Sequence, residues 1–499
     1  MIIIEAEKHH KKAIAYLEGV LDGQPHERNP QLAEKLLNEC LNYNIGHPVI
    51  LVTIALHHLS VGHYGQAISL LHHVVAAQPQ FGEAWNNLGL AYKMVPDFAK
   101  AEVALKNAAR FIKGESDLAD IYCNLAAIHI TRNMPEKVLE WSERALALIS
   151  DHPKGLWHKG LALLEMRKWD EAWEFHEYRL GDRGGAPGEI AVRNYHGPDG
   201  TTPEWDGKSP GKIAIHGEQG IGDEIMFASC IADAMKVPGT EFILEPSRRL
   251  QGLFQRSFPE TKVYGTNETD GRAWIGEIGK PDYKIALGSL PKFFRRSNEA
   301  FPGTPYIVPD PAKRQWWGEK LNALPRKPNI GIAWQGGVDS TRYDARSFHP
   351  VEFAPLFAAI DANWISLQYD STAQACVNDV KEKLGVKIKH WPAAVEMKNP
   401  ETGKLNDIDE LAALVSKLDF VISVPQTAYH VAGALGVPCL VLTPAEPDWR
   451  LAADGCTTNV WYSSVRLIRQ SDPMQWRPVV ERASAEVLDF FNLLKQAAT

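Results

Sequence analysis

A pattern of small and large apolar residues recurs along the first third of the chain with a period of about 34 residues. One unit has its characteristic residues at Trp85, Leu88, Gly89, Tyr92, Ala101 and Ala108. The unit before it has Leu51, Ile54, Ala55, His58, Ala67 and Leu71 at the equivalent positions. Small residues let two paired helices approach closely, and no single pair buries its own apolar face, so the units have to stack. The pattern therefore predicts an all-helical solenoid in a first domain of residues 1–180.

The spacing W-x2-L-G-x2-Y of the unit around Trp85 resembles that of tetratricopeptide repeats. Weaker units carry the same phase at Leu17, Ala33 and Leu37, at Tyr122, Leu125, Ala126 and Ala145, and at Leu156, Gly160, Leu163 and Ala172. The resemblance implies four or five repeats with a concave surface for a peptide or another protein. The alternative is a scaffold that only supports the rest of the chain or joins copies of it into a homo-oligomer.

Composition excludes several classes of protein. The formal charge of −8 argues against broad nucleic-acid binding, which requires a basic surface. No apolar run approaches the ~20 residues of a membrane span, and the opening run, Ile2 to Ile4, is too short for a signal peptide. The six cysteines form no CxxC pair and mostly lie in apolar runs, as buried free thiols do. We therefore expect a cytoplasmic protein without a membrane span.

Composition changes abruptly after residue 180, where Gly and Pro become frequent up to Pro210. Beyond this segment, apolar runs typical of strands, such as KIAIHG, EFILEP, NIGIAWQG and DFVISV, alternate with helical patterns. This alternation predicts parallel sheets in two α/β halves, at residues 181–310 and 311–499. Ligands of such sheets bind at the carboxyl ends of the strands, so we expect a site in a cleft between the two halves.

The first candidate site is the segment HGEQGIGDEIMF, residues 216–227. A strand ends there, glycines form a turn, and a helix is predicted to start near Asp223. Asp223 then either caps this helix or serves as a general base at the edge of the cleft. The acceptor-side candidates in the same turn are His216, Glu218 and Gln219. The segment lacks the GxGxxG spacing of a dinucleotide site, which argues against an oxidoreductase.

The second candidate site is DFVISVPQTAYHVAGALGVPCLVL, residues 419–442. A buried strand leads to a helix start at Gln426, Thr427 and Ala428, whose free backbone N–H groups suit a pyrophosphate. His430, one turn further on, either faces the phosphates or is packed, and Gly433 permits close packing.

A third segment, GIAWQGGVDSTRYDARSFHP, ends a strand at a glycine pair. Its Arg342 and Arg346 are either phosphate ligands or solvated surface residues.

The ordered set HGEQGIGDEIMFASCIADAM, LGSLP, GIAWQG, ARSF, WISLQ, VISVPQTAYHVAGALGVP and PDWR resembles tetratricopeptide proteins with a glycosyltransferase domain of the heptosyltransferase family, glycosyltransferase family 9. The resemblance implies a GT-B fold of two Rossmann-like halves, with the acceptor in the N-terminal half and the donor in the C-terminal half. It also implies Asp223 as the base, and Arg346 and His430 as donor-phosphate ligands. Pro425 departs from the family, which has an aspartate at this position.

The resulting prediction is an inverting glycosyltransferase that moves a sugar from a nucleotide-sugar donor to a hydroxyl acceptor. The resemblance also implies that the transfer needs no metal ion, and no cofactor is expected; the lack of a DxD motif at a strand end beside the expected donor cleft agrees with this. The sequence does not decide whether the acceptor is a protein, a glycan, a lipid-linked sugar or a modified nucleobase. A protein or glycan acceptor is expected to bind through the solenoid. The alternative is a non-catalytic adaptor with a degenerate transferase domain, which the Pro425 departure favours.

Overall fold

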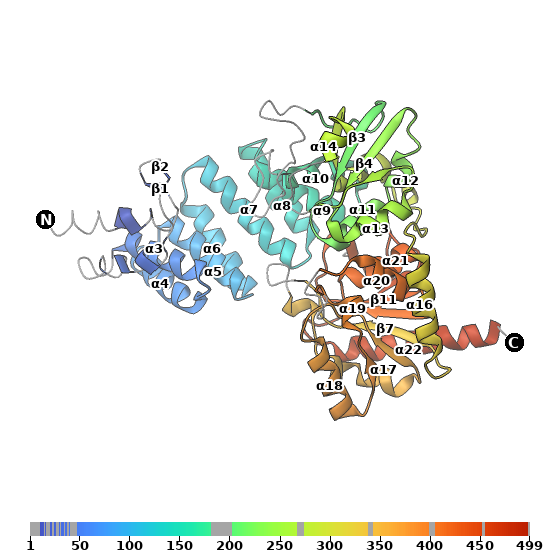
Figure 1. Cartoon of the computed structure of the whole chain (residues 1–499). Helices are drawn as coiled ribbons and strands as arrows, with labels where there is room; N and C mark the ends of the chain where they lie inside the picture. Colours follow the sequence, from blue (N-terminus) through green and yellow to red (C-terminus); the bar gives the residue numbers. More distant parts are fainter. Residues whose placement is uncertain are drawn as a thin grey trace. The chain divides into compact units, whose positions relative to one another are not determined.

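The computed structural model describes residues 10–13, 15, 20–21, 24–25, 29, 31–33, 35–36, 39, 47–180, 202–266, 274–337, 343–398, 405–451 and 455–497. The chain forms two compact units, Met1–Ala162 and Leu163–Thr499, which are described separately below (Figure 1). The predicted phosphate ligand Arg342 lies outside the described residues.

The first unit consists of helices paired as antiparallel hairpins, α3 with α4, α5 with α6, and α7 with α8. Its helices are α3 (Pro48–Ser60), α4 (Tyr64–Ala77), α5 (Gly82–Met94), α6 (Phe98–Phe111), α7 (Glu115–Thr131), α8 (Pro135–Leu148) and the start of α9 (Pro153–Glu165). Two short strands, β1 (Val20–Leu21) and β2 (Gln24–Pro25), pair ahead of them. In the weak first repeat, Ala33 is buried, whereas Leu17 and Leu37 lie outside the described residues.

The packing inside these hairpins confirms the predicted repeat. A Cβ atom added at Gly89 of α5 would lie 2.6 Å from Cγ of Leu105 on α6, so only glycine allows this approach of the two helices. The neighbouring repeat positions Leu88 and Ala101 are buried in the same core. The first unit is therefore a helical solenoid of the tetratricopeptide type.

The second unit begins inside α9 and includes α10 (Trp169–His176) and the 3₁₀ turn η1 (Glu177–Arg179). The sequence predicts a domain boundary after residue 180, but the compact units divide at Ala162. The reason is that α10 packs on the α/β part: the indole N–H of Trp173 donates to the carbonyl of Arg295 (2.7 Å), and that of Trp169 donates to Asn298 (2.8 Å). The last helix that fits the repeat pattern thus belongs to the α/β unit.

The N-terminal α/β half contains a four-stranded parallel sheet in the order β5-β4-β3-β6. Its elements are β3 (Gly211–His216), α11 (Ile221–Ala228), α12 (Ile231–Ala234), β4 (Thr240–Glu245), η3 (Arg248–Leu250), α13 (Gln251–Ser257), β5 (Lys262–Val263), α14 (Trp274–Ile278), β6 (Tyr283–Ala286), η4 (Leu287–Ser289), α15 (Pro291–Phe294) and η5 (Asn298–Ala300). The helix predicted to start near Asp223 begins at Ile221 as α11, and a second short helix, α12, follows it.

The C-terminal half contains a six-stranded parallel sheet in the order β12-β11-β10-β7-β8-β9. Its elements are α16 (Pro311–Asn322), β7 (Asn329–Ala333), η7 (Asp344–Arg346), η8 (Pro350–Phe353), α17 (Ala354–Ala359), β8 (Asn363–Ser366), α18 (Ala373–Leu384), β9 (Ile388–Lys389), α19 (Pro392–Val395), α20 (Ile408–Val415), β10 (Phe420–Ser423), α21 (Thr427–Leu435), β11 (Cys439–Thr443), η9 (Trp449–Leu451), β12 (Val465–Arg469) and α22 (Arg477–Ala497).

Both sheets have the strand order of a Rossmann fold, which confirms the predicted fold class. The order of the strands reverses between β7 and β10 in the C-terminal half, and between β3 and β6 in the N-terminal half. Helix α11, which follows β3, packs on α21, which follows β10 (Figure 1). Ligands of such sheets bind at the reversal points. The helix that follows the strand at one reversal point thus contacts the helix that follows the strand at the other.

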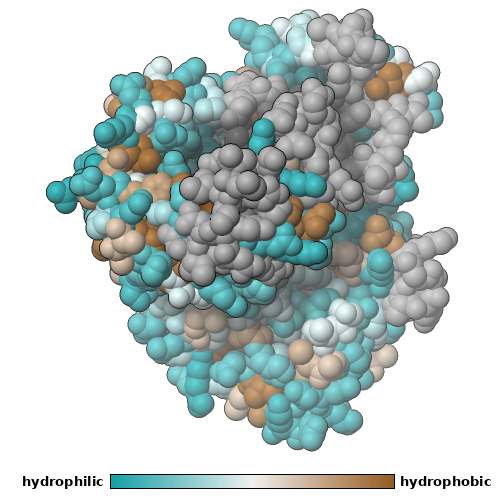
Figure 2. All heavy atoms as spheres, turned by 90° about the vertical axis from the view of Figure 1, so that its left-hand side faces the viewer, coloured by the Kyte–Doolittle hydropathy of each residue, from teal (hydrophilic) through white to brown (hydrophobic). Residues whose placement is uncertain are grey.

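Among the described residues, no helix combines the length and the hydropathy that crossing a bilayer requires. On the face shown in Figure 2, most of the coloured surface is hydrophilic, and hydrophobic side chains form small separate groups. Such scattered groups are ordinary for the surface of a globular protein.

Candidate functional site

Asp223 lies in the first turn of α11, beside the carboxyl end of β3. The cap residue of α11 is Gly220, and the helix begins at Ile221, so Asp223 does not occupy the cap position itself, which was one of the two alternatives for this residue. Asp223 instead occupies the third helical position, where its Oδ2 accepts a hydrogen bond from the backbone N–H of Gly220 (3.1 Å). A carboxylate there also interacts favourably with the helix dipole.

Arg450 from the C-terminal half reaches across to this turn. Its Nε lies 2.7 Å from Oδ1 of Asp223, and its Nη2 donates to Oε1 of Gln219 (2.7 Å). The guanidinium also lies 4.7 Å from the ring centre of Trp449. Only 18% of the Arg450 side chain and 21% of the Asp223 side chain are exposed, so water screens this pair less than a surface pair. The ion pair therefore joins the predicted base to the C-terminal half.

The turn between β10 and α21 lies against the end of β7. Gln426 caps α21, and its side-chain oxygen accepts a hydrogen bond from the N–H of Ala428 (3.3 Å). A Cβ atom at Gly336 would lie 2.4 Å from the carbonyl oxygen of Pro425, so the loops after β7 and β10 touch at the reversal point. Thr427 opens the first turn of α21, whose N-terminus provides the partial positive charge that an anion requires.

Two buried amide atoms at this reversal point have no hydrogen-bond partner among the described residues. They are Oε1 of Gln335, which follows β7, and Nε2 of Gln426, which follows β10. Leaving such an atom unsatisfied costs about 1–3 kcal/mol, so both amides are available to water or to a polar ligand at this position.

Arg346 lies on η7, in the loop that returns to the end of β7. The loop is held there because the hydroxyl of Ser347 accepts a hydrogen bond from the N–H of Gly336 (3.2 Å). Burial lowers the pKa of Arg346; Asp448 and Tyr429 oppose this shift, and the positive charge of Arg450 adds to it. Two guanidinium groups, from Arg346 and Arg450, are therefore close enough to influence each other. Such an arrangement is typical of an anion site.

His430 is buried at the contact between the two halves. Its Nδ1 lies 2.9 Å from the hydroxyl of Tyr462, and a Cβ atom at Gly222 of α11 would lie 2.7 Å from its Cδ2. Burial and the positive charge of Arg450 lower the pKa of His430 to about 3. The ring is neutral at physiological pH, so it can offer a hydrogen bond but no positive charge to a phosphate. Gly433, one turn later, packs against the ring of Tyr462.

The acceptor-side candidates separate into two groups. Gln219 lies beside Arg450 and has a left-handed backbone conformation with φ of 59°. His216 is buried at the end of β3. Glu218 is also buried, and both of its carboxylate oxygens bind Arg179, at 2.8 and 2.5 Å; one of them also accepts from the N–H of Gly288 (2.6 Å). The contacts of Glu218 are therefore internal.

Arg450 and Tyr462 are not predicted as site residues from the sequence, although both contact predicted site residues. The PDWR segment that contains Arg450 carries part of the family resemblance, so a signal was present. Nothing comparable distinguishes Tyr462, because its contact with His430 depends on how α21 packs on the loop before β12. Among the described residues, no group of three or more His, Cys, Asp or Glu side chains is placed to hold a metal ion.

No protein-family model matches the chain. Protein FlbA of Caulobacter vibrioides is 29% identical over 443 residues, which cover 85% of this chain and 70% of FlbA. The structure of Escherichia coli ADP-heptose lipopolysaccharide heptosyltransferase II is 14% identical, with a TM-score of 0.41 over 57% of this chain and 99% of the enzyme. That of Pseudomonas aeruginosa PilF is 15% identical, with a TM-score of 0.33 over 37% of this chain and 78% of PilF. The chain thus resembles tetratricopeptide proteins in its N-terminal part and a heptosyltransferase in its C-terminal part.

Proposed function

We propose that the protein is a glycosyltransferase that moves a sugar from a nucleoside-diphosphate donor to a hydroxyl group. The observation that carries the proposal is the arrangement at the reversal point between β7 and β10. There the N-terminus of α21, the unsatisfied amides of Gln335 and Gln426, and the guanidinium of Arg346 combine the groups that bind a diphosphate. Asp223 approaches from the N-terminal half through its ion pair with Arg450.

In this proposal the reaction is a direct displacement at the anomeric carbon. The acceptor oxygen bonds to that carbon, the bond to the diphosphate oxygen breaks, and Asp223 takes the hydroxyl proton. Arg346, Arg450 and the N–H groups at the start of α21 compensate the negative charge that develops on the leaving diphosphate. His430 keeps α11 and α21 in contact as a neutral side chain.

The ion pair also gives the proposal an order of events. While Arg450 holds Asp223 at 2.7 Å, one oxygen of the carboxylate is engaged and the other accepts from Gly220. A bound diphosphate competes for the guanidinium and releases Oδ1 to act as a base. Donor binding therefore precedes productive acceptor binding. In this proposal the helical unit binds the acceptor, a protein or a glycan.

A second candidate function is a non-catalytic adaptor. It is favoured by Pro425, which removes the acidic residue of the related enzymes, and by the engagement of both Asp223 oxygens in the structure. In that case the reversal point need not bind a nucleotide at all.

Calorimetry with UDP, GDP and ADP separates the two functions. We expect one nucleotide to bind, and Arg346→Ala to weaken binding by about 1–3 kcal/mol, as for a lost charge-assisted contact. Arg326→Ala is the matched control, because Arg326 is exposed and precedes β7 at the opposite edge of the sheet. A folded protein that binds none of the three nucleotides would favour the adaptor.

The role of Asp223 is tested by hydrolysis of the nucleotide sugar whose nucleotide binds, with water in place of the acceptor. Asp223→Asn should lower the rate by about 100–10,000-fold, while Asp361→Asn, at an exposed site, should leave it unchanged. Turnover of Asp223→Asn near the unsubstituted level would exclude Asp223 as the base.

A further inference from the structure

A pocket of about 810 Å³ opens between α16, α19 and the start of α20. This volume is in the range of sites for small molecules. Its walls share no residue with the candidate donor site, and they include Lys313, Trp316, Trp317, Lys320, Trp391 and Asp407. Asn406, also in the wall, accepts a hydrogen bond through its carbonyl from Arg249 of the N-terminal half (2.7 Å), so the pocket is anchored where the two halves meet.

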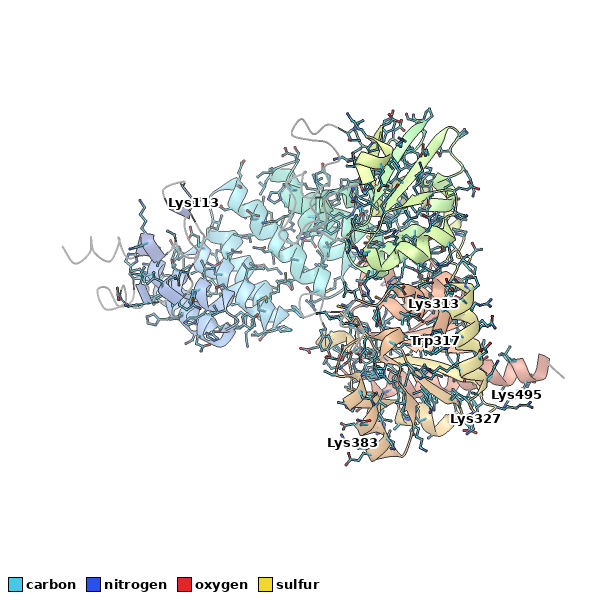
Figure 3. All side chains as sticks on the ribbon, in the orientation of Figure 1. Lys113, Lys313, Trp317, Lys327, Lys383 and Lys495 are labelled. Carbon is cyan, nitrogen blue, oxygen red and sulfur yellow. The ribbon has the colours of Figure 1, made fainter. Side chains whose placement is uncertain are left out.

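Three tryptophans form the aromatic side of this pocket. Trp316 is half exposed, whereas Trp317 is 2% exposed and donates its indole N–H to Glu410 (3.0 Å). The rings of Trp316 and Trp317 are nearly perpendicular, at 88°, and the Lys320 ammonium lies 4.3 Å from the ring centre of Trp316. Figure 3 labels Lys313 and Trp317, which both come from α16. These contacts fix the orientation of an indole that is left half in solvent, which favours ligand binding because little side-chain entropy remains to be lost.

The charged side chains that line the pocket balance, because Lys313 and Lys320 face Asp407 and Glu410. Lys313 pairs with Asp407 (3.1 Å) and with Glu410 (3.2 Å), and all three side chains are partly exposed. The Asp407 carboxylate also caps α20 by accepting from the N–H of Glu410 (3.1 Å). A pocket with hydrogen-bonding groups of both kinds and balanced charge fits a neutral polyhydroxylated ligand better than an ion.

We propose that this pocket binds a neutral saccharide by stacking a pyranose ring on the face of Trp316 that the Lys320 ammonium does not cover. A pyranose carries C–H groups on its faces and hydroxyl groups around its rim, which matches an exposed indole beside Lys313 and Asp407. Such a site would hold a glycan on the donor half without taking part in the chemistry. The proposal does not depend on the catalytic function proposed above, because none of its residues belongs to the donor site.

The test is ligand-observed NMR with the full chain and separate samples of maltohexaose, cellohexaose and chitohexaose. We expect saturation transfer to the ring protons of at least one of the three. Trp316→Ala should weaken that binding at least about tenfold, because the stacking surface is lost. Asp407→Asn, which keeps a side chain able to cap α20, should weaken it about fivefold through the lost charge-assisted bonds.

Leu493→Ala is the matched control, because Leu493 is 65% exposed on α22 and lies outside the pocket. Circular dichroism verifies that each variant is folded. If Trp316→Ala does not fold, Asp407→Asn still tests the proposal. An oligosaccharide affinity that neither pocket substitution lowers, measured by titration of the saturation-transfer signal, would overturn the proposal. The absence of saturation transfer to all three oligosaccharides at about 10 mM, where binding with a Kd in the millimolar range is detectable, would also overturn the proposal. The same holds if the pocket binds peptides but none of the oligosaccharides.

Discussion

Arg179 should be essential for the stability of the α/β unit. Its side chain is 3% exposed, and its guanidinium donates to Glu218 twice, to Ser289 (3.0 Å) and to Glu177 (2.9 Å). Arg179→Met keeps most of the side-chain volume but removes every one of these donors. The Glu218 carboxylate, which is fully buried, then lacks a counterion, although the N–H of Gly288 still donates to it.

Breaking a buried pair from one side costs about 3–5 kcal/mol, because the remaining charge stays buried. For a unit of this size, that loss corresponds to a decrease in melting temperature of roughly 4–7 °C. Scanning calorimetry of the full chain measures it as a shift of the α/β transition, and the transition of the helical unit should not move.

The double substitution Arg179→Met with Glu218→Gln provides the decisive comparison. It removes both partners, so it should destabilise the unit by at least about 1 kcal/mol less than the sum of the two single changes. An α/β transition of Arg179→Met that coincides with that of the unsubstituted protein would refute the reasoning.

Three further predictions concern other contacts of the α/β unit. A truncated chain that starts at Lys208 loses α10 and should be insoluble, whereas one that starts at Pro153 should fold; equal solubility in expression trials would contradict this. Gly222→Ala should destabilise the α/β unit by about 1–3 kcal/mol, because its Cβ would meet His430, while Gly276→Ala, with open space around it, should be neutral in thermal unfolding. Asp223→Asn and Arg450→Gln should show a coupling energy of about 1–2 kcal/mol in a thermal-unfolding cycle, and additivity within about 0.3 kcal/mol would mean that the pair does not form.

The sequence predicts elements well where the local pattern and the packing agree. The buried strands β3, β7 and β10 were predicted because each is a run of apolar residues. Helix α16 was not, because its charged residues and the prolines around it resemble a linker, although Pro311 merely occupies the first turn and Asp310 caps the helix. Strand β12 has arginines at two of its five positions, which obscures the apolar pattern.

The candidate site is predictable as far as each half carries its own motif. Asp223 and Gln426 follow buried strands, so their places at the carboxyl edges could be derived from the order of elements. The partners across the halves could not, because the contacts of Arg450 with Asp223 and of His430 with Gly222 depend on how two sheets pack together. The burial of Glu218 could not be predicted either, because its partner Arg179 lies on a helical turn outside the sheet.

The position of α10 has a consequence for how the chain could be divided. Residues 163–180 are part of the α/β unit through the hydrogen bonds of Trp173 and Arg179, and residues 181–201 separate them from the rest of that unit in the sequence. Two polypeptides of residues 1–180 and 202–499, expressed together, should therefore reassemble without a covalent connection. Conversely, a chimera that exchanges the repeats for those of another protein has to retain residues 163–180. Without them, Glu218 and the carbonyl of Arg295, which follows α15, would lose their partners Arg179 and Trp173.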